Sequence, residues 1–155
     1  MKINQTGALK MFKKLFVTII FTLMTINVYA NDSIGMVVAS KGNSYVNEKT
    51  ILQQGSLINI NDVITTSTQS FVVIQLTDGS KITVRPSSTV SMDQYSYDGS
   101  DADEVKLNLV QGGLRIITGA IAKNNPDNYI LETPVALMGV RGTEFSIILC
   151  DGNTC

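Results

Sequence analysis

The residues that could carry out chemistry are few in this 155-residue chain, and their types exclude the commonest catalytic devices. The sequence contains no histidine and only two cysteines. Without imidazole there is no Ser-His-Asp triad, no histidine metal ligand and no histidine acid-base step. Two thiols are too few for a structural zinc site. The composition therefore indicates a protein that is not an enzyme, and we expect neither a cofactor nor a metal.

The densest acidic segment runs from Asp93 to Glu104 and is typical of a solvated loop between strands. Paired carboxylates could act in glycoside hydrolysis, but nothing here marks a convergent pair. The segment also fails the EF-hand pattern, because its glycine comes second and its glutamate is misplaced. Tyr95 and Tyr97 lie in the same segment, and tyrosines beside acids can stack on sugar rings. We name these two tyrosines as candidate ligand-binding residues; the alternative is ordinary packing at a rim.

Both cysteines lie near the end of the sequence, as Cys150 and Cys155. The Asp-Gly-Asn-Thr segment between them is typical of a tight turn, which would place the two thiols opposite each other. In an oxidising compartment such a pair forms a disulfide. Closing so small a loop contributes roughly 2 kcal/mol, so we expect a clasp on the last strands and not the main source of stability. The spacing is not Cys-x-x-Cys, which disfavours a redox role.

The first thirty residues have the layout of a secretory signal peptide. Three lysines precede an apolar run over residues 15–26, and small residues lead up to Ala30. The run is interrupted by threonines and is shorter than a membrane-spanning helix requires. We therefore expect a signal helix, cleavage after Ala30 and a periplasmic or secreted protein with no stable membrane span. Two alternatives stay open: the leader is retained as an anchor, and translation starts at Met11 instead of Met1.

Removal of the leader leaves 155 − 30 = 125 residues, which suits a single domain over residues 31–155 with one modest core. Four of the twelve basic residues lie in the leader, so 12 − 4 = 8 remain against thirteen acids. The resulting net charge is 8 − 13 = −5. Nucleic acid is not an expected partner, because phosphate binding needs clustered positive charge.

Short, alternating, β-branched segments recur from residue 33 onward, and no segment of ten or more residues has apolar positions at helical spacing. Glycine-containing turns separate these segments, which predicts an all-β domain. A hairpin is expected around Thr77-Asp78-Gly79-Ser80, with apolar residues of both strands on one face. Strands are predicted at residues 71–76, 81–84, 105–110, 114–118 and 144–149, and the inward residues of the hairpin at Val72, Ile74, Leu76, Ile82 and Val84.

The same hairpin pattern is repeated around Gly112-Gly113, where Leu107 and Leu109 precede the glycines and Leu114 and Ile116 follow them. Nearer the C-terminus two further alternating runs are separated by Gly139-Val140-Arg141-Gly142. The expected inward residues of these runs are Val135 and Leu137, then Phe145, Ile147 and Leu149.

The Gly139-Val140-Arg141-Gly142 unit is expected to form a sharp corner that passes the chain from one layer of strands to another. Val140 would point into the core and Arg141 away from it. Because a bend leaves carbonyls unpaired, we expect the Arg141 guanidinium to donate to them, or to Glu144, Asp62 or Asp78. Contact with a ligand is the alternative role for this arginine.

These motifs together resemble the FecR domain over about residues 55–149. Hallmarks of that domain are a Gly-Asp-x-Ile-x-Thr step, an Asp-Gly-Ser turn and a Thr-Pro…Val-Arg-Gly-Thr-x-Phe close. Asp62, Ile64 and Thr65 fill the step, and Asn61 stands where the family usually has glycine; asparagine tolerates the left-handed region. The resemblance, with the corner described above, marks as structural signature residues Asp62, Asp78, Gly79, Ser80, Gly112, Thr133, Pro134, Gly139, Arg141, Gly142, Thr143 and Phe145.

The resemblance implies a short-stranded β-solenoid-like or sandwich-like fold and a binding role outside the cytoplasm. Well-known members are transmembrane regulators in which a cytoplasmic helical domain restrains a sigma factor and the periplasmic FecR domain receives a signal. This chain has no room for that cytoplasmic domain, so the sigma-regulating activity is not expected to transfer. We expect a noncatalytic module that engages an envelope protein in a sensing or regulatory role. The alternative is a cell-envelope scaffold or a protein associated with cell-wall glycan.

The leader generates a first testable prediction. Protein recovered from the cell envelope should begin at Asn31, because signal peptidase cuts after a small residue that follows the apolar run. Intact-mass and N-terminal peptide mass spectrometry will check this. Recovery of a chain that still begins at Met1 or Met11 would identify a retained anchor instead.

Overall fold

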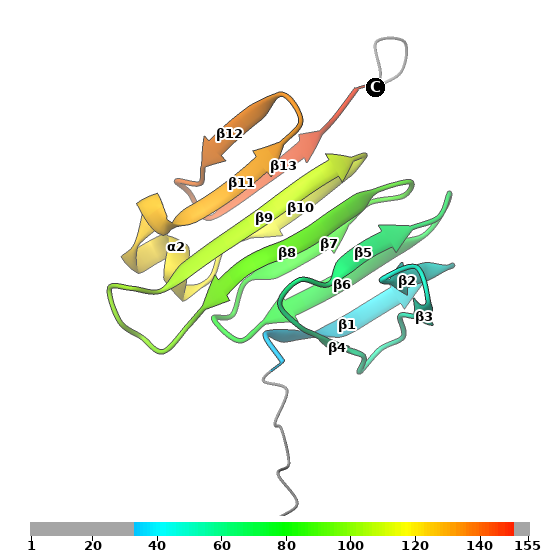
Figure 1. The fold of residues 1–155 in the computed structure, drawn as a ribbon, viewed down its shortest axis with the longest axis horizontal. Coiled ribbons are helices and arrows are strands. Elements are labelled where there is room, and N and C mark those ends of the chain that lie inside the picture. The colour runs from blue at the N-terminus through cyan, green and yellow to red at the C-terminus, as the bar shows by residue number, and fades with distance from the viewer. Residues whose placement is uncertain (1–32, 151–155) are drawn as a thin grey trace, which may run out of the picture. The chain divides into compact units, whose positions relative to one another are not determined.

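The computed structural model describes residues 33–150, which form two packed β-sheets (Figure 1). The leader, the Asp151-Gly152-Asn153 turn and Cys155 lie outside the described residues. The signal helix, the cleavage site and the disulfide between Cys150 and Cys155 therefore stay predictions. Within residues 33–150 no helix is long and apolar enough to cross a membrane.

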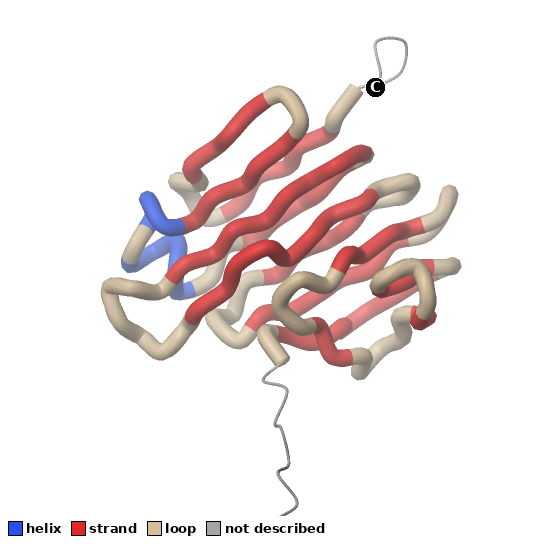
Figure 2. Tube along the Cα trace, viewed as in Figure 1, coloured by secondary structure: helices blue, strands red, loops and turns tan. Residues whose placement is uncertain are grey.

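Sheet A has six strands in the order β13-β10-β7-β6-β1-β4, and sheet B has seven in the order β12-β11-β9-β8-β5-β2-β3 (Figures 1 and 2). Neighbouring strands are antiparallel except for the parallel pair β9 and β11. The elements are β1 (Gly35–Lys41), β2 (Ser44–Val46), β3 (Thr50–Ile51), β4 (Leu57–Ile58), β5 (Val63–Thr66), β6 (Phe71–Leu76), β7 (Lys81–Val84), β8 (Thr89–Ser96), β9 (Glu104–Gln111), β10 (Gly113–Ile117), α2 (Ala120–Asn124), η1 (Pro126–Asn128), β11 (Tyr129–Thr133), β12 (Ala136–Gly139) and β13 (Glu144–Ile148).

The all-β prediction is confirmed, and the architecture is sandwich-like. All five predicted strands occur, each within one residue of its predicted bounds at either end. The hairpin around the Asp-Gly-Ser turn is formed by β6 and β7, with Val72 opposite Val84 and Ile74 opposite Ile82. These four side chains have no exposed surface, so they lie at the centre of the core between the sheets.

The second predicted hairpin is wrong. Strands β9 and β10 lie in different sheets, and Gly112-Gly113 carries the chain from sheet B to sheet A. The four leucine and isoleucine side chains around these glycines are nevertheless buried as expected. Inward alternation is the same whether two strands pair edge to edge or face each other across a core, so the pattern could not separate the two.

The predicted burial of Val135 and Leu137 is also wrong, because these side chains are 85% and 68% exposed. The residues of opposite parity, Met138 and Val140, pack against the core instead. Strand β12 is an edge strand of sheet B, and its apolar residues occupy both faces. The alternating residues Val135 and Leu137 therefore lie on the solvent-facing side of the chain and not on its core-facing side.

The features that were not predicted from the sequence include two short helices and the strand β8. Helix α2 has five residues and η1 has three, both shorter than any window in which helical spacing can be recognised. The acidic segment, expected to be a loop, begins inside the eight-residue strand β8, which carries Asp93 and Tyr95. Its outward residues are polar, which hid the strand.

Four crossings between the sheets lie side by side and are joined by hydrogen bonds. The Ser67 amide donates to the Asn43 carbonyl at 3.0 Å, and the Ser87 amide donates to the Ser67 carbonyl at 3.2 Å. The Gly113 amide donates to Ser88 Oγ at 2.8 Å. These bonds link the β1–β2, β5–β6, β7–β8 and β9–β10 crossings in turn, so polar groups at each bend are satisfied by the next bend.

Two of these crossings require glycine for the same reason. A Cβ on Gly42 would lie 2.3 Å from Ser70 Oγ, and one on Gly112 would lie 2.2 Å from Ser88 Oγ. Both glycines also have positive φ, 73° and 79°. A serine hydroxyl fills the space that each missing side chain leaves, which explains why Gly112 belongs to the signature.

This pairing predicts that Gly112→Ala destabilises the fold strongly. A left-handed backbone costs an alanine about 1 kcal/mol, and the clash with Ser88 adds about 1–3 kcal/mol for overpacking. Gly99→Ala is the matched control, because Gly99 has φ of 90° and nothing within 4 Å of the added Cβ. Urea unfolding should show a larger loss for the Gly112 variant; equal losses would contradict the close-packed corner.

Candidate functional site

The carboxylate of the signature residue Asp62 is hydrogen-bonded within the fold. It accepts the Asn59 amide and the Asn47 side-chain amide, both at 2.8 Å. Asn61 has φ of 66°, so it adopts the left-handed conformation expected of a glycine substitute. Asp62 therefore closes a turn between strands and is buried in doing so.

The threonine that matters in this step is Thr66 and not Thr65. Thr66 is buried, and its hydroxyl accepts the Ser88 amide at 3.0 Å and donates to the Arg85 carbonyl. Its neighbour Thr65 points to the outer face of sheet B and is only partly buried. The motif Gly-Asp-x-Ile-x-Thr, counted from Asn61, ends at residue 66, so the spacing itself carried the correct position.

The Asp78-Gly79-Ser80 turn is a buried polar hub. Asp78 accepts the Ser80 amide at 2.9 Å and the Ser80 hydroxyl at 2.7 Å. Ser80 Oγ in turn accepts the Gly119 amide at 2.9 Å. A Cβ on Gly119 would lie 2.4 Å from the Asp78 carbonyl oxygen, so the chain approaches this turn closely just before α2. The turn thus joins the β6–β7 hairpin to the start of the helix.

Tyr95 links this hub to the other sheet. Its hydroxyl accepts the Asp78 amide at 2.8 Å and bonds Thr77 Oγ1 at 2.7 Å. Burial is the main cause that raises the pKa of Tyr95 to about 12, and the Asp78 charge adds to it. Because the hydroxyl is occupied inside the fold, Tyr95 acts as a brace between sheets. Tyr97 lies beyond the end of β8 and is 39% exposed, so its ligand-binding role stays a prediction.

The corner predicted at Gly139-Val140-Arg141-Gly142 does pass the chain from one sheet to the other, from β12 in sheet B to β13 in sheet A. Val140 points inward and is 5% exposed. Arg141 points outward, but its partner is Asp127 at 2.7 Å and not a carbonyl or the acids expected. Glu144 instead pairs with Arg115.

Thr118 performs the bracing that was assigned to the arginine. Its hydroxyl donates to the Gly142 carbonyl at 2.7 Å, and its amide donates to the Thr143 carbonyl at 3.0 Å. A buried threonine thus satisfies the carbonyls of the bend from the neighbouring strand. The sequence held no signal for this contact, because the two residues are more than twenty positions apart.

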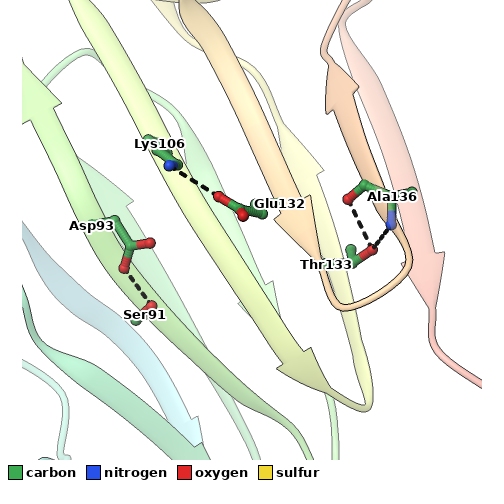
Figure 3. Close-up of polar contacts among 6 residues, drawn as sticks. All are labelled: Ser91, Asp93, Lys106, Glu132, Thr133 and Ala136. Atoms are coloured by element: carbon green, nitrogen blue, oxygen red, sulfur yellow. Dashed lines mark hydrogen bonds and ion pairs between the residues drawn. The ribbon is translucent and has the colours of Figure 1, made fainter.

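The remaining signature residues close the β11–β12 hairpin and the last strand. Thr133 Oγ1 accepts the Ala136 amide at 2.9 Å and donates to the Ala136 carbonyl at 3.0 Å (Figure 3). Pro134 lies within this turn. Phe145 is partly buried against the core. The signature residues are therefore spread through both sheets as turns, corners and core contacts, and they do not converge on one site.

Organised polar groups lie on the outer faces of both sheets, and on sheet A they include the Arg115–Glu144 ion pair. The outer face of sheet B is defined here by the half-buried residues Ser91, Asp93, Lys106, Asn108 and Glu132. Lys106 Nζ lies 2.9 Å from Glu132 Oε2, and the Ser91 hydroxyl donates to Asp93 (Figure 3). Ser91 is opposite Asn108, which is opposite Glu132, across β8, β9 and β11. Alternation with the buried Val105, Leu107 and Leu109 could have identified this face.

Glu132 holds Lys106 in its charged form on this face. The hydrogen bond and ion pair that Lys106 forms with Glu132 raise the pKa of Lys106, and the Asp93 charge adds a smaller effect. A lysine held more firmly in its charged form is a poor nucleophile and a poor general base. Among residues 33–150 no three acidic, histidine or cysteine side chains are placed to hold a metal ion.

Comparison with known proteins identifies a family. A family model described as FecR protein matches residues 62–154. The matched range begins at Asp62 and includes the Asp-Gly-Ser turn, Gly112 and the Gly139–Gly142 corner. No curated protein and no solved structure matches the chain.

The Tyr95 brace predicts a loss of stability in Tyr95→Phe. Removal of the hydroxyl leaves the Asp78 amide without its acceptor, which costs about 1–3 kcal/mol. Tyr97→Phe is the control, since its side chain is exposed and should change stability by less than about 0.5 kcal/mol. The two variants are compared by urea unfolding at neutral pH.

Comparison of wild type with Tyr95→Phe also tests the pKa of Tyr95. A tyrosine whose pKa rises from 10.0 to about 12 on folding stabilises the protein fully below its unfolded pKa, and this contribution is lost as pH rises between these values. Wild type should therefore lose more stability than Tyr95→Phe between pH 8 and about pH 11. Burial also raises the pKa of Tyr129, so some loss should remain in the variant. Equal losses would contradict the brace.

Proposed function

The chain belongs to the FecR protein family, and from that premise we propose that it is a noncatalytic extracytoplasmic module that engages another envelope protein in a sensing or regulatory role. The family is one of non-enzymatic regulators, and the matched range covers more than half of the chain. The proposal adds to this membership the location, which comes from the leader, and the kind of partner.

The observation that carries the proposal is the direction in which the polar residues of the domain point. Asp62, Asp78 and Asp103 are at most 8% exposed, and each accepts backbone amides within the fold. These carboxylates stabilise turns and are not available to a substrate. Groups that can meet another molecule therefore include those on the outer faces of the sheets.

The outer face of sheet B is the surface that we assign to the partner. It crosses the three adjacent strands β8, β9 and β11, and it presents one cation, Lys106, between two anions, Asp93 and Glu132. Hydrogen-bonding groups from Ser91 and Asn108 extend the same row. Mixed charge on a rigid sheet gives orientation and specificity to a protein contact. The net charge of −5 over residues 31–155 favours a basic surface on the partner.

A second candidate function rests on Tyr97. This tyrosine is exposed at the end of β8, beside the acidic loop, where an aromatic ring could stack on a sugar. The protein would then be a scaffold or a glycan-associated component of the envelope. Retention on purified cell wall, compared between wild type and Tyr97→Ala, tests this function; loss of retention in the variant would support it.

A photo-crosslinking amino acid at Asn108, in intact cells that make the full-length chain, tests the first function. We expect one crosslinked protein at near-stoichiometric yield, identified by mass spectrometry. The matched control is Thr83, which is equally half-buried and points outward from the middle of sheet A. Crosslinks that are equal at both positions, or none at Asn108, would contradict the assignment of the sheet B face.

A further inference from the structure

The two sheets end unevenly at one side of the sandwich. Strands β9 and β10 face each other because the Gly112 corner joins them across the core. Outward from this pair come β11 in sheet B and β13 in sheet A, and then β12 in sheet B alone. In the described part of the chain, sheet A has no strand opposite β12. Figure 1 shows β12 at this margin, with β13 running behind β11. The result is a step one strand wide.

The step leaves apolar side chains uncovered. A hollow of about 170 Å³ lies beneath β12, lined by Met138, Gly139, Val140, Arg141 and Phe145. Met138 and Phe145 pack against the core but are only partly buried. Leu137 on β12 is 68% exposed and Ile148 on β13 is 50% exposed.

Backbone groups at the step also point outward. The Val140 amide donates to the Tyr129 carbonyl at 2.9 Å, so the alternate residues Leu137 and Gly139 direct their amides and carbonyls to the free edge. The Leu149 amide donates to the Gly112 carbonyl at 2.8 Å, so Ser146 and Ile148 do the same on β13. Each edge can accept a further strand.

The opposite side of the sandwich is closed. The β1–β2 crossing joins facing strands, and the next strands outward are β4 in sheet A and β3 in sheet B, so the sheets end level. The chain between β3 and β4 crosses this side. Leu52 in this segment and Ile58 in β4 are 2% and 0% exposed. The chain covers the core between the sheets at this side, and a hollow of about 350 Å³ lined by Met36, Leu57 and Gln75, among others, lies at β1, β4 and β6. The β12–β13 side differs in that one sheet extends a strand beyond the other.

We propose that the step is filled by a second copy of this chain. A twofold axis between the layers and parallel to the strands exchanges the two layers, so β12 of each copy enters the empty place beside β13 of the other. Rotation about such an axis preserves strand direction. Because β12 and β13 run in opposite directions, the new pairs are antiparallel. Both layers then become continuous sheets of 6 + 7 = 13 strands. This inference is independent of the proposed function.

Charge and shape at the two edges complement each other. Residues 133–140 contain no charged side chain, so nothing on β12 repels its own copy. When Leu137 lies opposite Ile148 of the second copy, Gly139 lies opposite Ser146. The next pair in the same register is Arg141 opposite Glu144, which brings opposite charges together. The exposed side chains of Leu137 and Ile148 thereby cover each other.

The size of the contact sets the expected affinity. Strands β12 and β13 have four and five residues, so each edge is only about 15 Å long. Interfaces that bury less than about 1,000 Å² are weak or transient. We therefore expect a reversible dimer with a dissociation constant of roughly 10–100 μM.

Sedimentation velocity of the purified mature protein from about 5 to about 500 μM tests the proposal, after non-reducing gel electrophoresis has shown the sample to be free of disulfide-linked dimers. Wild type should shift from monomer to dimer. Leu137→Lys and Ile148→Lys, each on one side of the new strand pair, should weaken association at least about tenfold. Leu57→Lys is the matched control, because Leu57 is a 57% exposed leucine on the closed side, in β4.

Three outcomes would overturn the proposal. A wild-type monomer over the whole range would mean that the step does not bind its own copy. Equal weakening by Leu57→Lys would show that exposed leucines in general drive association. A ladder of species larger than the dimer would show head-to-tail stacking, which a twofold contact forbids. Circular dichroism of each variant confirms that the exposed substitutions leave the fold intact.

Discussion

The fold depends on how the backbone crosses between its two sheets. A strand that leaves one layer and enters the other gives up its ladder partners, and its amides and carbonyls must find others. Here the crossings lie next to one another and satisfy one another, and serine hydroxyls fill the space above glycines that could carry no side chain. Burial of the leucine, isoleucine and valine side chains between the layers is possible only because these bends are satisfied.

The signature glycines leave space for close packing at the bends, whereas the acidic signature residues provide buried hydrogen-bond acceptors. A buried carboxylate is costly unless it is fully hydrogen-bonded. Asp62 and Asp78 meet that condition through backbone amides, which makes them turn-forming groups. The signature motif is therefore distributed over the structure as a set of turns and braces, and the surfaces available for recognition lie between its members.

Much of this architecture could be predicted from the sequence, and the failures have physical causes. Alternation identified the β6–β7 hairpin and its inward residues, because β-branched residues and a strong turn agree there. It could not separate a hairpin from a crossing at Gly112, since both keep the same side chains inward. It also misplaced the inward face of β12, where apolar residues occupy both sides of an edge strand.

The candidate site was harder to anticipate than the fold. Arg141 attracted attention because arginine can satisfy several carbonyls, yet the carbonyls of its corner are held by Thr118, a residue distant in sequence. Lys106 and Glu132 were not predicted as site residues, although their outward positions follow from the burial of their neighbours. Pairing between strands that are distant in the sequence, such as β9 and β11, decides which polar residues meet. A local sequence pattern does not specify this pairing.

The position of the first strand bears on how the chain reaches its native state. Strand β1 pairs along its whole length only with β6. Gly35 therefore gains its partner Leu76, and Lys41 its partner Phe71, only after β6 has been synthesised. During synthesis some forty residues emerge before the earliest strand has its principal neighbour, and ordering such distant contacts is slow. Sheet A therefore cannot form progressively from the N-terminus, and its completion depends on β10 and β13, which the chain supplies last.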